Sequence, residues 1–583
     1  MSANVEWLQR EAGVSSYREL HAWSVQHREV FWEMVLKRLG IRLRQPHSRI
    51  VDPSSGVETP RWLVGARMNI ADSCFQAAAD SIAIVHQGES GELQRITVGE
   101  LEALTNRVAN GLNAMGLRAG DAVAVVTPMT AESVAFYLGA VKAGCVIVSI
   151  PDSFSPGEIA TRLRLGNAKA VFTQDVNPRG GKDLPLYANV SAASTLPAIV
   201  VRRSTMALRD DDRDWSHFLS ANDDFISVER DPADAINILF SSGTTGGPKA
   251  IPWTQTTPIK CAMDAHFHQD VHPGDVLAWP TNLGWMMGPW LIFAALINRA
   301  TIALFNGAPT GTAFGRFIEH SRATMLGVVP SLVKTWRATQ CMDGLDWSSL
   351  RVFSNTGECS NADDMRWLMQ LAGNKPVVEY CGGTEIGGGY ITSVITEPCA
   401  PACFNTPALG LDLVILDEDG QSTDNGEVFI LGPSIGLSTT LLNQSHHDVY
   451  FANVPREGMR RHGDQIERLP NGQMRAHGRV DDTMNLGGIK VSSAEIERAV
   501  RTVSGIQDAA AIAVPPPGGG PGELVIFVVA SSSAADLRDP MQRAIREQLS
   551  PLFKIHDVVA VDALPRTASN KVMRRVLRDR CMA

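Results

Sequence analysis

The sequence centres on the stretch Leu239-Phe-Ser-Ser-Gly-Thr-Thr-Gly-Gly-Pro-Lys-Ala-Ile-Pro-Trp-Thr254. The apolar, β-prone run Ala235-Ile-Asn-Ile-Leu-Phe240 leads into it and predicts a buried strand. Hydroxyl and glycine residues then let the backbone fold closely around a triphosphate-sized anion, and a lysine adds a positive charge. The residues expected to bind the phosphates are Ser241, Ser242, Gly243, Thr244, Thr245, Gly246, Gly247 and Lys249.

This loop is not a Walker A motif, because Pro248 separates the last glycine from Lys249 and Ala250 stands where that motif needs Ser or Thr. A loop rich in Gly, Ser and Thr is, by itself, more often a surface turn. The order Ser-Ser-Gly-Thr-Thr-Gly-Gly-Pro-Lys is more specific. It resembles the ATP-phosphate loop of the adenylate-forming superfamily, which includes acyl-CoA synthetases, luciferases and peptide-synthetase adenylation domains.

Composition is that of an ordinary globular protein, with 583 residues, 44% hydrophobic and 20% charged, enough for two or more domains. The net charge of −9 argues against a general nucleic-acid binder.

The polar, acidic start of the chain predicts no signal peptide, and the apolar residues 285–297 are too few to span a membrane. Nine scattered cysteines indicate reduced thiols and a cytoplasmic location. The pairs His266/His268 and His446/His447 lack Cys or acidic partners nearby, so we expect no metal site there.

Periodicity divides the chain into three parts. Residues 1–70 look helical and amphipathic, with aromatic residues near helical spacing. From about residue 70 to 235, helical patterns alternate with short apolar runs, which predicts parallel sheets covered by helices and a ligand site at the carboxyl ends of the strands. Near the C-terminus, Ser492 and Glu495 form a capping box that starts a helix, and apolar strands follow.

A second motif, Glu379-Tyr-Cys-Gly-Gly-Thr-Glu-Ile-Gly387, follows at the interval expected for the adenylate-forming superfamily. The resemblance implies that the hydroxyl of Thr384 contacts the α-phosphate and that the carboxylate of Glu385 holds Mg²⁺, which prefers hard oxygen ligands. Val352-Phe-Ser-Asn-Thr-Gly-Glu-Cys359 resembles the strand and turn that approach the adenine. Further nucleotide contacts implied in this way are Gly357, Glu358, Tyr380 and Cys381.

Two later motifs concern the ribose and the junction between domains. Arg461-His-Gly-Asp464 resembles the segment whose aspartate, here Asp464, accepts hydrogen bonds from the ribose hydroxyls. Gly478-Arg-Val-Asp-Asp482 resembles the hinge, with Arg479 near the ribose and Asp481 as the pivot.

The last two motifs concern the thiol and the catalytic lysine. Asn485-Leu-Gly-Gly-Ile-Lys490 is expected to contact CoA through Gly487, Gly488 and Lys490. Leu564-Pro-Arg-Thr-Ala-Ser-Asn-Lys571 ends at the position of the family's catalytic lysine, Lys571. The resemblance thus covers essentially the whole chain.

The resemblance implies an α/β fold with a large N-terminal domain of helix-covered sheets and a small, mobile α+β C-terminal domain. We expect an N-terminal helical extension at residues 1–70, an adenylation domain at 71–480 and a small domain at 481–583 that swings about Asp481. The implied activity is that of an ATP-dependent carboxylic acid:CoA ligase, with ATP, Mg²⁺ and CoA as co-substrate. Lys571 assists acyl-adenylate formation, and residues 487–490 replace it for thioester formation.

The chain departs from acetyl-CoA synthetases at the acid pocket, where those enzymes have two tryptophans and this chain has Cys381 and Gly382. Gly382 is expected to enlarge the pocket by the volume of an indole, so we expect a medium-chain, branched or aryl-alkanoic acid, larger than acetate. Cys381 also replaces an aromatic residue that stacks on adenine, and Lys490 replaces an arginine. The residues expected to line the acid pocket are Trp285, Met286, Met287, Gly382 and Gly383.

Several alternatives remain open from the sequence. The Cys-Gly-Gly-Thr order is closer to acetoacetyl-CoA synthetases, and the acceptor could be the thiol of a carrier protein. A non-catalytic ATP-binding regulator is disfavoured, because Lys249, Glu385, Asp464, Arg479 and Lys571 are all present. Residues 477–493 look most like plant peroxisomal acyl-activating enzymes, but Cys581-Met-Ala583 is not a peroxisomal ending. We expect a cytoplasmic monomer or homodimer without a nucleic-acid partner or a membrane span.

Overall fold

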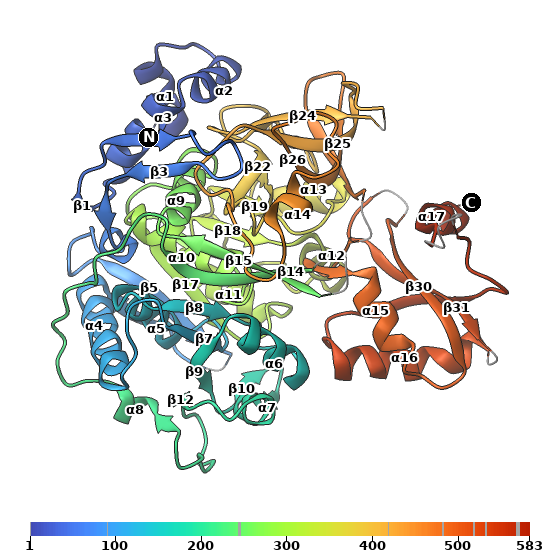
Figure 1. Cartoon of the computed structure of the whole chain (residues 1–583), viewed down its shortest axis with the longest axis horizontal. Helices are drawn as coiled ribbons and strands as arrows, with labels where there is room; N and C mark the ends of the chain where they lie inside the picture. The colour runs from blue at the N-terminus through green and yellow to red at the C-terminus, as the bar shows by residue number, and fades with distance from the viewer. Residues whose placement is uncertain are drawn as a thin grey trace.

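Two seven-stranded sheets form the centre of the large N-terminal domain (Figure 1). The computed structural model describes residues 2–89, 91–242, 247–417, 419–480, 483–516, 519–530, 533–566 and 572–582. The first sheet has the order β13 (Arg213–Asp214), β12 (Ala198–Val201), β9 (Ala168–Gln174), β7 (Ala122–Val126), β8 (Val146–Ser149), β14 (Ala235–Ser242) and β15 (Pro248–Thr254). The second has the order β20 (Val377–Glu379), β19 (Val352–Asn355), β18 (Met325–Val328), β16 (Val276–Ala278), β17 (Thr301–Asn306), β5 (Ile82–Gly88) and β6 (Gln94–Thr97).

Most neighbouring strands in these sheets are parallel. The antiparallel pairs are β14 with β15 and β5 with β6, each at one edge. Helices cover the sheets, so a central strand such as β7 is buried at every residue, as its run of Ala and Val requires. The helix α10 (Met287–Ile297) is apolar on all sides and fully buried in the main core.

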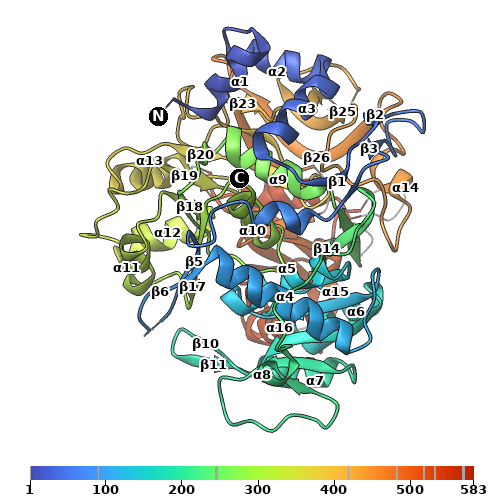
Figure 2. The same ribbon diagram turned by 90° about the vertical axis from the view of Figure 1, so that its left-hand side faces the viewer.

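The remaining helices of the large domain cover the sheets or join their strands (Figures 1 and 2). They are η1 (Ile70–Cys74), α4 (Val98–Ala114), α5 (Ala131–Lys142), α6 (Pro156–Leu165), α7 (Leu186–Ala193), α8 (Trp215–Phe218), α9 (Thr257–Phe267), α11 (Thr312–His320), α12 (Pro330–Thr339), α13 (Ala362–Leu371) and α14 (His446–Tyr450). A short hairpin consists of β10 (Asn177–Arg179) and β11 (Lys182–Leu184). In the described ranges no helix has the length and apolar character needed to cross a bilayer.

The N-terminal extension is helical only in its first half. The helices α1 (Asn4–Ala12), α2 (Tyr17–Gln26) and α3 (Arg28–Leu39) are followed by the short strands β1 (Leu43–Gln45), β2 (Arg49–Asp52), β3 (Arg61–Val64) and β4 (Arg67–Met68). The prediction of helix up to residue 70 is therefore wrong beyond Leu39. Pro46, Pro53 and Pro60 interrupt any helix in this segment, and the antiparallel pairs β1–β4 and β2–β3 form instead.

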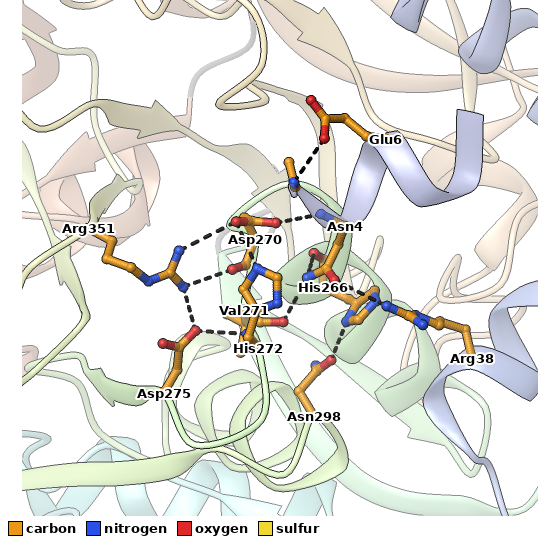
Figure 3. A network of polar contacts seen from close by, with 11 residues as sticks. Asn4, Glu6, Arg38, His266, Asp270, Val271, His272, Asp275, Asn298 and Arg351 are labelled. Atoms are coloured by element: carbon orange, nitrogen blue, oxygen red, sulfur yellow. Dashed lines mark hydrogen bonds and ion pairs between the residues drawn. The ribbon is translucent and has the colours of Figure 1, made fainter. Parts of the chain in front are cut away.

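Hydrogen bonds connect the N-terminal helices to the large domain (Figure 3). The backbone N–H of Asn4 donates to Asp270 Oδ1 at 2.7 Å, and its side-chain amide donates to the carbonyls of His266 at 3.0 Å and Val271 at 2.9 Å. Burial, aided by the charge of Arg38, lowers the pKa of His266 to about 3. The ring is therefore neutral and its Nε2 accepts a hydrogen bond from Arg38 Nε at 3.1 Å. The extension is thus an integral layer of the large domain.

Two antiparallel sheets complete the large domain. The first consists of β21 (Cys381–Gly383), β22 (Gly388–Thr392) and β23 (Thr406–Pro407). The second consists of β24 (Asp412–Leu416), β25 (Asn425–Leu431), β26 (Met459–Arg468) and β27 (Met474–Arg479). The turn between β21 and β22 carries Thr384 and Glu385.

A small α+β domain follows and lies to one side of the large domain (Figure 1). It contains β28 (Thr483–Leu486), β29 (Ile489–Ser492), α15 (Ser493–Val500), β30 (Ile506–Val514), β31 (Glu523–Ala530), α16 (Ala534–Gln548), β32 (Ile555–Ala560) and α17 (Arg574–Met582). Its apolar residues form clusters separate from the main core. The capping box predicted at Ser492 and Glu495 is confirmed at the start of α15.

Candidate active site

A cavity of about 450 Å³ opens where strands of both large sheets end and the small domain meets the large one. Ser241 at the end of β14, Asn306 at the end of β17 and Thr356 just after β19 all line it. It therefore lies at the carboxyl ends of parallel strands, where α/β folds bind their ligands. The cavity brings together the predicted residues Ser241, Trp285, Met286, Met287, Gly357, Gly382, Gly383, Thr384, Gly487, Gly488 and Lys490.

The predicted phosphate loop joins β14 to β15. These strands pair Ser241 with Lys249 and Ser242 with Pro248, so both ends of the loop are held side by side. Gly243, Thr244, Thr245 and Gly246 lie outside the described residues. Gly247 directly precedes β15, and Nζ of Lys249 lies 5.4 Å from the centroid of the Tyr450 ring.

The carboxylate of Glu385 is buried next to positive charges. Burial alone would raise the pKa of Glu385, but the charges of Lys490, Lys249 and His462 hold it well below its usual value. Its backbone carbonyl accepts hydrogen bonds from Ser438 N at 2.8 Å and Arg460 Nη2 at 3.3 Å. The carboxylate of Glu385 is therefore ionised, and hydrogen bonds fix its backbone.

A second carboxylate, Asp464, is held by donors from three strands. Arg479 Nη1 on β27 donates to Asp464 Oδ1 at 3.2 Å, and the hydroxyl of Tyr390 on β22 donates to Oδ2 at 2.8 Å. The thiol of Cys381 lies 3.4 Å from the same oxygen. Burial would raise the pKa of Asp464, but His462, Arg479 and Lys490 hold it well below its usual range. Asp464 and Arg479 thus lie together, as their motifs predict for a ribose site.

The sequence reasoning missed two residues of this cluster, His462 and Tyr390. His462 Nε2 lies 3.0 Å from Asp464 Oδ2, and its Nδ1 lies 3.7 Å from Glu385 Oε1. Its ring meets that of Tyr390 edge-on at 4.4 Å. His462 stands inside the quoted motif Arg461-His-Gly-Asp464, so its position two residues before Asp464 on one strand was the available signal.

Tyr380 does not present its ring to the cavity. The side chain is 1% exposed, its hydroxyl donates to Asp264 Oδ2 at 2.6 Å, and Trp290 Nε1 donates to that hydroxyl at 3.1 Å. Successive residues of an extended segment point to opposite sides, so Tyr380 points into the core while Cys381 points toward Asp464. The expectation that the Tyr380 side chain binds the nucleotide is therefore wrong for this structure.

Gly382 lines the cavity through its backbone. A Cβ atom added there would lie 1.9 Å from the carbonyl oxygen of Gly388, across the β21–β22 pair. A side chain at this position would meet backbone and not open space. The argument that Gly382 leaves the volume of an indole free in the pocket does not fit this backbone, so other residues determine the size of the cavity.

Gly357 and Glu358 join the large domain to the small one. Oε1 of Glu358 accepts from Gly488 N at 2.9 Å, and Oε2 accepts from Ser331 N at 2.8 Å. Gly357 has a φ of +98°, and a Cβ there would lie 3.3 Å from the Cα of Gly488. The two backbones pack closely here, and the positive φ of Gly357 and of Gly488 (+77°) favours glycine at both positions.

Residues 487–490 lie at the cavity. The described residues that follow Lys571, from Val572 to Met582, lie in the small domain away from these residues. Lys571 and Asp481 are outside the described residues. Arg574 pairs with Glu497 of α15, and α17 packs against β30 on the side of the small domain that faces away from the large domain (Figure 1). In this structure Lys490 therefore lies near Glu385, and the helix α17 that follows Lys571 does not.

Trp285 lies between the two domains. Its ring meets that of Phe154 edge-on at 5.6 Å. It packs both against the apolar cluster that includes β7 and β8 and against the core of the small domain. The side chain expected in the acid pocket is therefore also part of the domain interface.

Glu379, just before the Thr-Glu motif, is the source of a pH-dependent prediction. Burial raises the pKa of Glu379 from 4.5 to about 7, although Ser360 and Asn355 donate hydrogen bonds to it. Between these pH values the folded state keeps a proton that the unfolded state has released, so stability falls as the pH rises from 4.5 to 7. Relative to Glu379→Gln, the unaltered protein should lose roughly 3 kcal/mol of unfolding free energy.

Urea denaturation of both proteins at several pH values from acidic to mildly alkaline checks this prediction. Glu229→Gln, at an exposed position, is the matched control and should leave the pH dependence unchanged. A constant difference between Glu379→Gln and the unaltered protein across this range would contradict it.

Comparisons with known proteins agree with this arrangement. A model of the AMP-binding enzyme family matches residues 72–438, a model of its C-terminal domain matches 495–571, and a model of the acetyl-coenzyme A synthetase N-terminus matches 17–74. The chain therefore belongs to the AMP-binding enzyme family. Within this family it is an AMP-forming acyl-CoA synthetase, and the resemblance noted from its motifs is confirmed.

Individual relatives cover nearly the whole chain. "Probable acyl-activating enzyme 17, peroxisomal" of Arabidopsis thaliana is 47% identical, over 97% of this chain and 83% of its own length. "Hexanoyl-CoA synthase" of Cannabis sativa is 45% identical over the same shares. The solved acetoacetyl-CoA synthetase from Streptomyces lividans has a TM-score of 0.79 at 27% identity and covers 99% of this chain and 93% of its own.

Proposed function

We propose that this acyl-CoA synthetase activates a carboxylic acid larger than acetate, of the medium-chain, branched or aryl-alkanoic type, and transfers its acyl group to CoA. The observation that carries this proposal is the apolar lining on one side of the cavity. The side chains concerned are Trp279, Met286, Met287, Leu304, Phe305, Val329 and Leu332. The name of the Cannabis sativa relative, a hexanoyl-CoA synthase, supports an acid of this size.

The residue roles follow from the charges around the cavity. In the first step an oxygen of the substrate carboxylate attacks the α-phosphorus of ATP, the bond to the bridging oxygen breaks and pyrophosphate leaves. Like charges oppose this attack, so the enzyme acts mainly by positioning and charge neutralisation. We assign the β- and γ-phosphates to residues 241–249, the α-phosphate to Thr384 and the ribose to Asp464 and Arg479.

Glu385 is suited to Mg²⁺. Its pKa lies well below the usual value, so the carboxylate is ionised at neutral pH. In the part of the chain that the structure describes, no three His, Cys, Asp or Glu side chains gather as a metal site. A single carboxylate fits Mg²⁺, which takes most of its ligands from phosphates and water and would neutralise phosphate charge there.

The arrangement of the domains supports the second step. The thiol sulfur of CoA attacks the acyl carbonyl, and the bond to the AMP oxygen breaks. Gly487, Gly488 and Lys490 line the cavity in this structure, and Glu358 holds Gly488 in place. We propose that this is the arrangement for thioester formation and that rotation about Asp481 brings Lys571 to the cavity for adenylate formation, with domains at 71–480 and 481–583.

The proposal also covers the cellular location of the protein and its oligomeric state. We propose a cytoplasmic monomer or homodimer. Two of the relatives carry the word peroxisomal in their names. Imaging of the tagged chain beside a peroxisomal marker distinguishes the two locations, and sedimentation of the purified protein measures its assembly.

The test of the substrate class is pyrophosphate release with ATP, Mg²⁺ and CoA across a panel of acids: acetate, acetoacetate, fatty acids from butyrate to dodecanoate, and branched and aryl-alkanoic acids. We expect kcat/KM for the best medium-chain or aryl acid to exceed that for acetate by about a hundredfold, since several methylenes in an apolar pocket each contribute roughly 0.8 kcal/mol.

Reactions without acid are the control for simple ATP hydrolysis. Preference for acetate would refute the size argument while leaving the reaction class intact, and preference for acetoacetate would select the 3-oxo acid alternative. Pyrophosphate release without formation of an acyl-CoA would favour a carrier-protein thiol as the acceptor.

A further inference from the structure

The indole of Trp279 lies directly over Gly327. Trp279 directly follows β16 and Gly327 lies within β18; these strands are parallel neighbours in which Ala278 pairs with Leu326. A Cβ atom at Gly327 would lie 1.9 Å from Cδ2 and 2.2 Å from Cε3 of Trp279. Real Cβ atoms essentially never come within 3.0 Å of another heavy atom. The ring thus occupies the space that any side chain at 327 would need.

The face of the indole that points away from the cavity packs against the protein core. It is 4% exposed and meets the ring of Trp290 edge-on, with the centroids 5.4 Å apart. Trp290 is fully buried, and its N–H donates to the hydroxyl of Tyr380, which in turn donates to Asp264. The side chains on the core side of Trp279 are therefore closely packed, and moving the indole toward them would destabilise the fold. The direction left for the indole is toward the cavity that it lines.

Apolar side chains from elements next to β16 line the cavity together with Trp279. Met286 and Met287 begin α10 close by, and Leu304 and Phe305 come from β17, the other neighbour of β16. The charged residues that line the same cavity, Asp152, Arg179 and Lys490, come from other elements. An alkyl or aryl chain buried against these side chains would gain from the removal of apolar surface from water.

We propose that Trp279 forms the floor of the acid-binding part of the cavity and that Gly327 sets its depth. The pair thereby determines the longest acyl chain that the enzyme accepts. This inference rests on the proposed function, because it takes the apolar side of the cavity as the site of the acid. It replaces Gly382 as the feature that decides the size of the acid.

Gly327→Ala tests this by pushing the indole into the cavity. We expect kcat/KM for octanoate to fall at least tenfold relative to that for butyrate, the range in which an apolar pocket discriminates by size. Trp279→Leu should shift the preference in the opposite direction, so that the ratio of decanoate to hexanoate rises about tenfold. Leucine keeps the floor apolar and leaves a smaller void than alanine, which favours folding.

Gly315→Ala on α11 is the matched control. A Cβ there would lie 2.3 Å from Leu345 Cδ1 and 2.6 Å from Met342 Sδ, so this change also strains a packed region, but Gly315 does not line the cavity. It should lower the melting temperature without changing the ratio between acids.

The outcomes separate the two proposals. If the unaltered enzyme is active and Gly327→Ala leaves the octanoate-to-butyrate ratio unchanged, the proposed role of Trp279 is overturned and the proposed function is not. An equal change for all acids in both variants would overturn that role as well. Failure of the unaltered enzyme to release pyrophosphate with any acid would overturn the proposed function and this inference together.

Discussion

Lys571→Ala is expected to slow acyl-adenylate formation by about a hundred- to a thousandfold, and to leave most of thioester formation from supplied acyl-AMP intact. A charged contact made only in the transition state for attack on phosphorus has an effect of this size. The structure provides the reason for the division. Lys490 lies near Glu385 when Glu358 holds Gly488 at the cavity, whereas the helix α17 that follows Lys571 packs against β30.

The measurement is acid-dependent exchange of pyrophosphate into ATP for the first step, and consumption of synthetic acyl-AMP by CoA for the second. Lys554→Ala removes an exposed lysine from the same small domain and should change neither rate. Lys490→Ala should slow the second step more than the first. Equal losses of both half-reactions in Lys571→Ala would refute the assignment of one lysine to each step.

Lys260→Met is expected to destabilise the fold by about 3–5 kcal/mol, because it leaves the carboxylate of Asp264 unpaired in the core. Both side chains are 0% exposed, and Lys260 Nζ lies 2.5 Å from Asp264 Oδ1. The double variant Lys260→Met/Asp264→Asn removes both charges and should recover most of the lost stability, since buried ion pairs are replaceable by neutral groups. Chemical denaturation at neutral pH measures the three free energies.

This ion pair also bears on catalysis, because Asp264 Oδ2 accepts from the hydroxyl of Tyr380 and from Gly389 N at 2.9 Å. Those contacts hold both ends of the turn that carries Thr384 and Glu385. Asparagine at position 264 keeps a side-chain oxygen that accepts hydrogen bonds from Tyr380 and Gly389, whereas leucine has no acceptor. Lys260→Met/Asp264→Leu should therefore need about tenfold more Mg²⁺ for pyrophosphate exchange than the asparagine variant. Equal Mg²⁺ requirements in the two double variants would limit the pair to a structural role.

Local patterns predicted several elements of the fold. The apolar run at 235–240 belongs to β14, the alternation expected between residues 70 and 235 includes the strands β7 and β8, and the helix expected from Ser492 is α15. In these segments burial and capping agree with the intrinsic preference of the chain, so the sequence pattern is sufficient. Residues 43–68 were misjudged because amphipathic spacing was extended across three prolines into a segment stabilised by strand pairing.

The motifs predict Glu385, Asp464 and Arg479 as site residues, and the structure brings Asp464 and Arg479 together. The motifs say nothing of the direction in which Tyr380 points or of what a side chain at Gly382 would meet. Both depend on the pairing of β21 with β22 and on the packing of α9 beneath them. Tyr390 was missed because only the folded sheets bring β22 and β26 together at Asp464. His462 is on the same strand as Asp464, two residues before it, and that spacing was the signal for it.

The position of Trp285 between the two domains makes its fluorescence sensitive to their separation. Its indole belongs to the packing of both domains and lies against Phe154 and the core of the small domain, so departure of the small domain would change the polarity around it. Indole emission shifts with the polarity of its surroundings. If the proposed rotation about Asp481 exchanges Lys490 for Lys571, Trp285 is a natural fluorophore at the interface that opens. Each alternation of the catalytic cycle would then be an event that can be timed in a stopped-flow instrument without an attached dye.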